Sequence, residues 1–179
     1  KVDAVLYTHT HADHLFGLDD LRRFNDLSGE EIPIYGDEET LEDIRRAYRY
    51  IFVETQEGGG KPRISLNVVP QRFELFGLEI QSFYVMHGKL PVLAYRFGNF
   101  AYVTDTNHIP PDSMEKLRNL DLLILDGTWT HARKLYGAQR WLQKRNYQVP
   151  AENDNGYTTP VLFQWRGEPA LRSWGGDHR

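Results

Sequence analysis

The amino-acid sequence predicts a mixed α/β domain with both hairpin and crossover connections. First, short apolar runs of strand length alternate with segments whose apolar residues recur at helical spacing. Second, the chain has 179 residues, of which 40% are hydrophobic and 26% are charged, and this balance is typical of a globular domain with its own core. Third, it contains no cysteine, so neither disulfides nor thiolate-bound metals stabilise that core.

The first part of the chain predicts alternating strands and helices. In chain order these are a buried strand over residues 2–8, a helix over 15–26, a short strand over 32–35 and a helix over 38–52. The first helix is predicted because Leu15, Leu18 and Leu21 recur on one helical face. The second is predicted to begin after Asp37, an N-cap residue, with acidic residues in its first turn. A glycine-rich loop over 56–63 follows.

The next part predicts a group of strands and one further helix. The strands are expected over residues 64–70, 73–86, 93–97 and 100–104, which are separated by turn-type residues. Pro110 and Pro111 open a short helix that ends near residue 119, because proline fits the first helical positions. An apolar run over 121–126 then predicts another buried strand.

The composition changes shortly before residue 131. Residues 1–130 hold 13 Lys and Arg against 21 Asp and Glu, whereas residues 131–179 hold 8 against 4. We therefore predict one domain over 1–127 and an atypical tail over 128–179 that is basic and holds all four tryptophans. Two interpretations of the tail stay open: an extension that binds a partner, or a segment that is frame-shifted or partly disordered.

The strongest functional signal is a histidine cluster where the first predicted strand meets the first predicted helix. His9, His11 and His14 fall within six residues, with Asp13 among them. Side chains alternate in an extended backbone, so His9 and His11 point to the same side, while Asp13 and His14 leave from the turn into the helix. Imidazole and carboxylate are the ligands that zinc and manganese accept when no thiolate is available. The segment therefore predicts a site for two metal ions.

This cluster resembles the H-x-H-x-D-H signature of the metallo-β-lactamase superfamily. Residues 1–126 look most similar to its PhnP-like branch, which hydrolyses phosphoribosyl 1,2-cyclic phosphate and related cyclic phosphodiesters. The similar stretches are residues 7–14, 17–22, 32–36, 85–88, 102–105 and 122–126. The resemblance implies an αββα sandwich with mixed sheets. Because the family continues at both ends, we expect an N-terminal truncation and a fold that is incomplete at both ends.

The resemblance also implies a role for each residue of a two-metal site. The implied ligands are His9, His11 and His87 for the first metal, Asp13 and His14 for the second, and Asp105 as a bridge between the two. The sequence around His87 and Asp105 agrees, because each residue ends an apolar run of strand character. The candidate catalytic residues are Asp13, as acceptor of the proton of the attacking water, and His131, as a donor to the substrate.

One departure from the family concerns the last ligand of the second metal. The family supplies it from a final strand that ends in T-H-x-x-H, and no such pattern follows residue 126. His131 and His178 are the only histidines in that part of the chain, and both lie in unmatched contexts. We therefore expect two divalent metals, Zn²⁺ or Mn²⁺, of which the second binds weakly.

The resemblance implies a metal-dependent hydrolase. The expected activity is that of a phosphodiesterase, which cleaves a small cyclic phosphodiester with a hydroxide generated at the metals. Two alternatives stay open: a metal-binding fragment without turnover, and a nuclease of the same superfamily. The net charge of −4 disfavours the nuclease, because a basic face for nucleic acid is lacking.

The sequence also predicts location and partners. No segment approaches the roughly 20 apolar residues of a membrane span, and no signal-peptide pattern is visible. We therefore expect a cytoplasmic protein that binds no membrane and acts on a small-molecule phosphodiester. The oligomeric state stays open, with a homodimer as one alternative.

Overall fold

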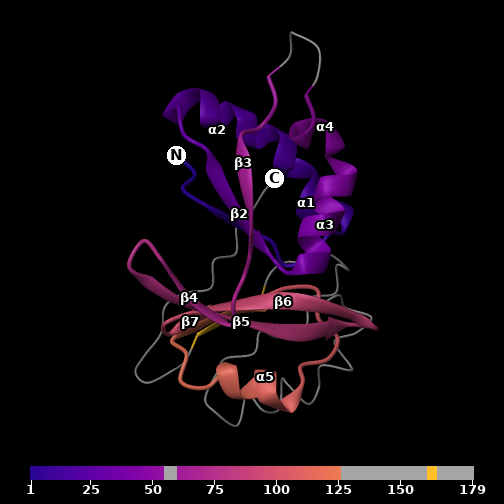
Figure 1. Ribbon diagram of the computed structural model, residues 1–179. Helices are drawn as coiled ribbons and strands as arrows, with labels where there is room; N and C mark the ends of the chain where they lie inside the picture. The colour runs from indigo at the N-terminus through magenta and orange to yellow at the C-terminus, as the bar shows by residue number, and fades with distance from the viewer. Residues whose placement is uncertain (55–59, 126–160, 165–179) are drawn as a thin grey trace, which may run out of the picture.

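The computed structural model describes residues 1–54 and 60–125 and the backbone of residues 161–164, which together form two sheets flanked by helices. Helices α1–α4 lie beside the three-stranded sheet, and α5 lies on the far side of the six-stranded sheet (Figure 1). The order of layers is therefore helices, sheet, sheet and helix. This arrangement confirms the predicted αββα sandwich.

The three-stranded sheet is parallel, with the strand order β1-β2-β3. Its strands are β1 (Val5–Leu6), β2 (Ile32–Gly36) and β3 (Ile64–Val68). Its helices are α1 (Ala12–Leu15), the 3-10 helix η1 (Phe16–Asp20), α2 (Leu21–Ser28), α3 (Glu38–Ala47) and α4 (Arg49–Phe52). Buried aliphatic side chains such as Leu18, Ile34 and Ile44 fill the space between these helices and the sheet. The segments that follow parallel strands leave from one edge of the sheet, and the histidine cluster follows β1 there.

The six-stranded sheet is mixed, with the order β4-β5-β6-β7-β8-β9. Its strands are β4 (Arg72–Leu75), β5 (Leu78–His87), β6 (Leu90–Phe97), β7 (Phe100–Val103), β8 (Leu122–Leu125) and β9 (Val161–Gln164). Only the β7–β8 pair is parallel, as the chain passes through α5 (Pro111–Lys116) between these strands. Buried Val85, Val103, Leu117 and Leu123 form the core beneath this sheet.

The strand expected over 2–8 is limited to β1, the strand expected over 93–97 begins earlier as β6, and three further elements differ in their organisation. The strand expected over 73–86 is a hairpin, because Phe76 and Gly77 both adopt positive φ angles of 54° and 80°, as a tight hairpin turn requires. The helix expected over 38–52 is interrupted at Tyr48, whose φ of −114° and ψ of 40° are not helical. The first helix begins earlier than expected, at Ala12, and continues through η1 into α2.

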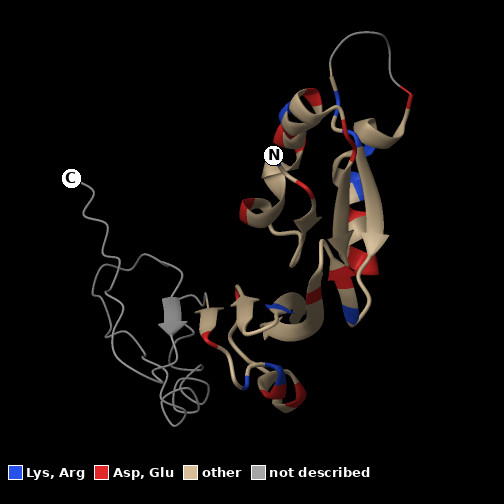
Figure 2. Cartoon of the chain, turned by 90° about the vertical axis from the view of Figure 1, so that its left-hand side faces the viewer, with Lys and Arg blue, Asp and Glu red and all other residues tan. Residues whose placement is uncertain are grey.

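Residues 55–59, 126–160 and 165–179 lie outside the described part of the chain. The domain boundary after residue 127 and both interpretations of the tail therefore stay predictions. Within the tail, β9 pairs antiparallel with β8. Figure 2 shows both acidic and basic residues on the helices of the first sheet; along α3 the acidic residues Glu38 and Glu39 lie in the first turn and the basic residues Arg45 and Arg46 in the last.

None of the helices described is both long enough and apolar enough to cross a membrane.

Two hydrogen bonds join the sheets next to the histidine cluster. The hydroxyl of Tyr95, a residue of β6 that is 2% exposed, donates to the carbonyl oxygen of Tyr7 at 2.6 Å. The N–H of Leu93 donates to the carbonyl oxygen of Thr8 at 2.9 Å. Burial raises the pKa of Tyr95, so its hydroxyl stays protonated as a donor. Strand β6 thus fixes the position of the segment that follows β1.

We predict that Tyr95→Phe destabilises the protein by about 1–3 kcal/mol, because it leaves the buried carbonyl of Tyr7 without its donor. The matched control is Tyr84→Phe, which removes a hydroxyl bonded to Asp37 at the surface and should cost less than about 1 kcal/mol. Urea unfolding of the three proteins measures both values. Equal losses in the two variants would contradict a special role for the contact between the sheets.

Candidate metal centre

Four predicted ligands, His9, His11, Asp13 and His14, come from the segment that runs from the end of β1 into α1. His9 follows the strand, and its imidazole is buried. His11 is the N-cap residue of α1 and is extended, with φ of −60° and ψ of 150°. Its carbonyl oxygen accepts hydrogen bonds from the N–H groups of His14 and Leu15 at 2.9 and 3.0 Å. A strand end, a turn and the first helical turn therefore carry three imidazoles within six residues.

The other two central ligands come from the six-stranded sheet. His87 is the last residue of β5, and Asp105 follows the end of β7. The N–H of Met86 donates to the carbonyl oxygen of His108 at 2.8 Å, and the N–H of Asn107 donates to the carbonyl oxygen of Met86 at 2.9 Å. These backbone bonds hold the end of β5 beside the loop that carries Asp105.

Asp105 has a left-handed backbone and faces the imidazoles. Its φ of 47° is uncommon for a residue other than glycine, although aspartate tolerates it better than most. Strained residues of this kind cluster at functional sites, where the surrounding structure holds them in place. The Oδ2 atom of Asp105 lies 3.4 Å from His14 Nε2, 3.5 Å from His9 Nε2 and 4.0 Å from His11 Nδ1.

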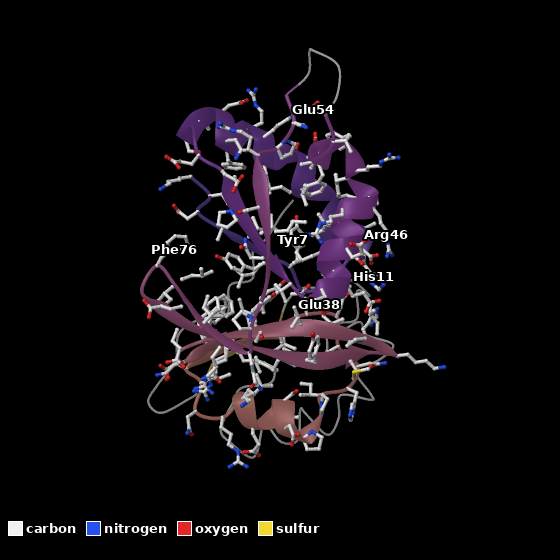
Figure 3. The ribbon with its side chains drawn as sticks, viewed as in Figure 1. Tyr7, His11, Glu38, Arg46, Glu54 and Phe76 are labelled. Carbon is white, nitrogen blue, oxygen red and sulfur yellow. The ribbon has the colours of Figure 1, made fainter. Side chains whose placement is uncertain are left out.

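The ring of His87 completes the cluster on the side of His11. The ring centroids of His11 and His87 are 5.3 Å apart, and those of His9 and His87 are 6.4 Å apart. His9 also lies 4.6 Å from His11 and 4.4 Å from His14, measured between ring centroids. Figure 3 places His11 where the helices of the first sheet meet the six-stranded sheet. The fold thus brings four imidazoles and one carboxylate together from both sheets.

The two remaining site predictions have different outcomes. Asp13 lies at the rim of the cluster, where its side chain is 79% exposed and its Oδ2 atom is 3.4 Å from His14 Nε2. His131 lies outside the described residues, so its predicted role stays a prediction.

The donor set fits a divalent metal. Potential ligand atoms of His9, His11 and Asp105 all lie within 4.8 Å of one another. Two buried side-chain polar atoms in the described ranges have no hydrogen-bond partner: Nε2 of His9, within the cluster, and Oγ1 of Thr104, the residue before Asp105 in the chain. An unpartnered buried polar atom costs about 1–3 kcal/mol, and a metal ion would use the lone pair of His9.

Thr8 carries a role that the sequence pattern did not predict. Its Oγ1 atom lies 3.1 Å from His9 Nδ1. In the tautomer with its proton on Nδ1, His9 donates to this oxygen and keeps the lone pair on Nε2, the atom that faces Asp105. A polar side chain at the end of an apolar strand is the local signal for such a partner.

The protonation state of His9 also suits a ligand. Burial lowers the pKa of His9 to about 4, with a further electrostatic contribution from the neighbouring imidazole of His14. Asp105 acts in the opposite direction and is outweighed. The imidazole is therefore neutral near pH 7, which is the form that binds metals.

Comparison with known proteins gives a family and several relatives. A family model described as the beta-lactamase superfamily domain matches residues 1–153. A crystal structure of a diphosphatase from the PhnP family superposes with a TM-score of 0.65 and 29% sequence identity, covering 91% of this chain and 71% of that one. The metallo-beta-lactamase fold protein YhfI from Bacillus subtilis superposes with a TM-score of 0.49 and 21% identity, covering 68% of this chain and 48% of that one.

One curated relative is an octanoyltransferase from Porphyromonas gingivalis (strain ATCC BAA-308 / W83). It is 36% identical over 129 residues, which are 71% of this chain and 26% of that protein. The chain thus spans about a quarter of the length of this relative. The family match over most of the chain, together with the PhnP-family structure, agrees with the resemblance carried by the histidine cluster: the chain belongs to the beta-lactamase superfamily.

Proposed function

We propose that this superfamily hydrolase is a metal-dependent phosphodiesterase, and that its centre is the cluster of His9, His11, His87 and Asp105. The observation that carries the proposal is the buried Nε2 atom of His9, which has no hydrogen-bond partner among the described residues and faces Asp105 at 3.5 Å. A buried imidazole with a lone pair directed at a carboxylate is the arrangement expected of a ligand pair for a divalent cation.

The candidate ligands are assigned to two metal ions according to their burial and position. His9, His11 and Asp105 would hold the tighter ion with His87, while Asp13 and His14 would hold a second ion less firmly. A divalent cation supplies Lewis-acid activation of water and positive charge for an anionic phosphoryl group. Asp13 lies in the first turn of α1 beside His14, where its largely exposed carboxylate can accept a proton from an approaching water.

The choice of a phosphorus-containing substrate is supported by the structural neighbour in the PhnP family. That protein is named a diphosphatase, so a diphosphate linkage is the second candidate for the bond that is cleaved. Octanoyl transfer is not proposed, because the matching segment covers only 26% of the protein with that name.

We predict that His11→Ala and Asp105→Asn each abolish metal-dependent hydrolysis and weaken the tight metal site by more than about 100-fold, beyond the loss typical of an outer partner. Asn at position 105 keeps the side-chain shape and tolerates the left-handed backbone, so the fold should survive. Metal analysis after dialysis, and competition with a chelator, measure the binding.

The control for these variants is His108→Ala, which removes an exposed histidine from the same loop as Asp105. This protein should retain one tightly bound ion per chain, as the wild type should. Full metal content in both ligand variants would show that the centre lies elsewhere.

We predict that the metal-free protein loses stability as the pH falls from about 6.5 to about 4. The pKa of His9 is about 4 when folded and near 6.5 when unfolded, so in this range the unfolded chain binds the proton more readily. The loss from this residue should approach about 3 kcal/mol and level off below pH 4. Urea unfolding with chelator present should give a shallower pH slope for His9→Gln than for the wild type or His108→Ala; parallel slopes would contradict the burial effect.

We predict turnover of bis-p-nitrophenyl phosphate with added Mn²⁺ or Zn²⁺, and little turnover of p-nitrophenyl phosphate or of a β-lactam. Both phosphate esters release p-nitrophenolate, so they differ only in the second ester group and in charge, the monoester carrying about one more negative charge. A diester of diphosphate tests the second candidate in the same assay. Comparable rates on the monoester would contradict the diesterase, and bound metal without any turnover would favour an inert metal-binding chain.

A further inference from the structure

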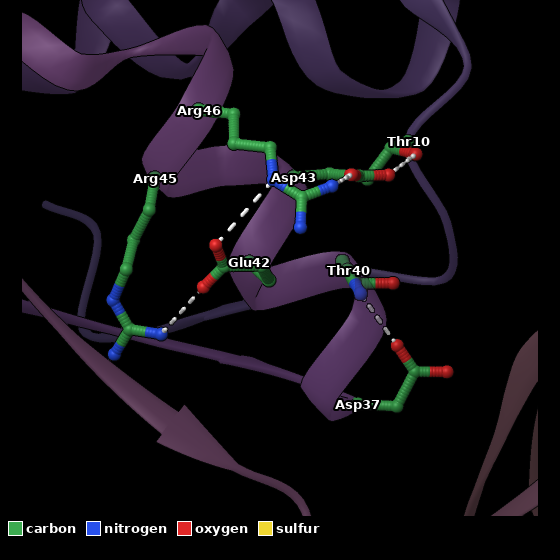
Figure 4. Close-up of polar contacts among 7 residues, drawn as sticks. All are labelled: Thr10, Asp37, Thr40, Glu42, Asp43, Arg45 and Arg46. Atoms are coloured by element: carbon green, nitrogen blue, oxygen red, sulfur yellow. Dashed lines mark hydrogen bonds and ion pairs between the residues drawn. The ribbon is translucent and has the colours of Figure 1, made fainter.

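Helix α3 contacts the ligand segment through a residue outside the metal cluster. Thr10, which separates His9 from His11, donates from its Oγ1 atom to Oδ2 of Asp43 at 3.1 Å (Figure 4). In an extended segment, Thr10 projects away from the side shared by the two histidines. The hydrogen bond therefore holds the segment on the side opposite its two imidazoles, those of His9 and His11, which face Asp105.

The carboxylate of Asp43 is itself held in place. Arg46 Nη1, one helical turn further along, lies 3.4 Å from its Oδ1 atom and leaves Oδ2 to accept from Thr10 (Figure 4). Leu41 and Ile44, on either side of Asp43 along the helix, are buried in the core of the first sheet. Asp43 thus projects from a helix that is anchored by packing.

The start of the same helix is tied to the second sheet. Asp37 Oδ1 accepts a hydrogen bond from the N–H of Thr40 at 2.8 Å and so caps α3. Its Oδ2 atom accepts from the hydroxyl of Tyr84 at 3.2 Å, and Tyr84 lies on β5, the strand that ends at His87. One helix is therefore bonded to both elements that carry imidazoles of the centre.

The two ligands beside Thr10 differ in how they are held. His9 is buried and has Thr8 as a partner. The side chain of His11 is 48% exposed, and its described contacts are with Asp105 and with other imidazoles of the centre. The position of His11 before metal binds therefore depends on its backbone, which is held by α1 on one side and by Thr10 on the other.

We propose that Asp43 is a positioning residue for the metal centre: through Thr10 it holds the backbone between His9 and His11 in the geometry that binds metal. The inference rests on the proposed function, because it assigns Asp43 a role toward the same centre. Removing an outer partner of a metal ligand typically costs 10–100-fold in metal affinity, and we expect a loss in that range.

The test compares metal affinity in four variants. Thr10→Val removes the hydroxyl with little change of shape, and Asp43→Ala removes the acceptor; each should weaken Zn²⁺ binding about 10–100-fold in chelator competition. Thr10→Ser keeps the hydroxyl and should stay within about threefold of the wild type. Glu42→Ala is the matched control, since Glu42 pairs with Arg45 and Arg46 on the same helix.

A double variant separates positioning from general stability. If the two residues act through one bond, Thr10→Val combined with Asp43→Ala should bind Zn²⁺ no more weakly than the poorer single variant. Metal-free circular dichroism and unfolding midpoints, recorded on every protein, show whether each variant is folded at the temperature of the titration. Should Asp43→Ala fail to fold, the contrast between Thr10→Val and Thr10→Ser decides the question.

Two different failures are distinguishable. If the wild type binds Zn²⁺ tightly and Thr10→Val and Asp43→Ala bind it equally well, the positioning role is wrong and the proposed function stands. Equal losses of Zn²⁺ affinity in Thr10→Ser and Thr10→Val, or in Glu42→Ala and Asp43→Ala, would also contradict the positioning role. If the wild type binds no divalent metal, the proposed function fails and this inference fails with it.

Discussion

Burial of His9 at the carboxyl end of β1 is the constraint on which the rest of the centre depends. The fold removes this imidazole from water and directs its Nε2 atom at Asp105, with no hydrogen-bond partner among the described residues. Such an arrangement is costly in the metal-free chain, because a buried polar atom is left unpaired and the charged form of the ring is disfavoured. A histidine that binds a metal needs these same conditions, a nitrogen lone pair that is not hydrogen-bonded and a neutral ring.

The centre exists only where the two sheets meet. The three histidines of the cluster after β1 come from the parallel sheet, whereas His87 and Asp105 come from the mixed sheet. Tyr95 and Leu93 of β6 bond directly to the backbone that precedes His9. These contacts fix the distance between the two ligand groups, so stability of the sandwich and geometry of the centre depend on the same bonds.

The residues of the centre differ in burial, so part of the centre is exposed to solvent. His9 is buried, Asp105 and His14 are largely covered, His11 is half exposed and Asp13 is exposed. Solvent can therefore reach the centre at His11 and Asp13, whereas His9 is covered. The exposed residues depend most on support from outside the cluster, which is the position of Thr10 and Asp43 relative to His11.

The sequence by itself determined the fold class, the location of most strands and the histidine cluster, because period-two and helical patterns and ligand spacing are local properties. It placed the N-cap of α3 correctly at Asp37, whose side chain accepts from Thr40. It did not predict the hairpin turn at Phe76, because phenylalanine is a poor match for a positive φ angle and the turn forms where β4 and β5 pair.

Only the tertiary structure decided how the ligands meet. Asp105 and His87 have ordinary local sequence contexts, and their convergence depends on backbone bonds between segments about twenty residues apart. Asp43 lies 33 positions from Thr10, and nothing in the spacing of charges along α3 distinguishes it from Glu42. The physical reason is that the residue type alone decides whether a side chain can bind a metal. The distances between such side chains, and the hydrogen bonds that hold them in place, arise from packing between elements that are far apart in the chain.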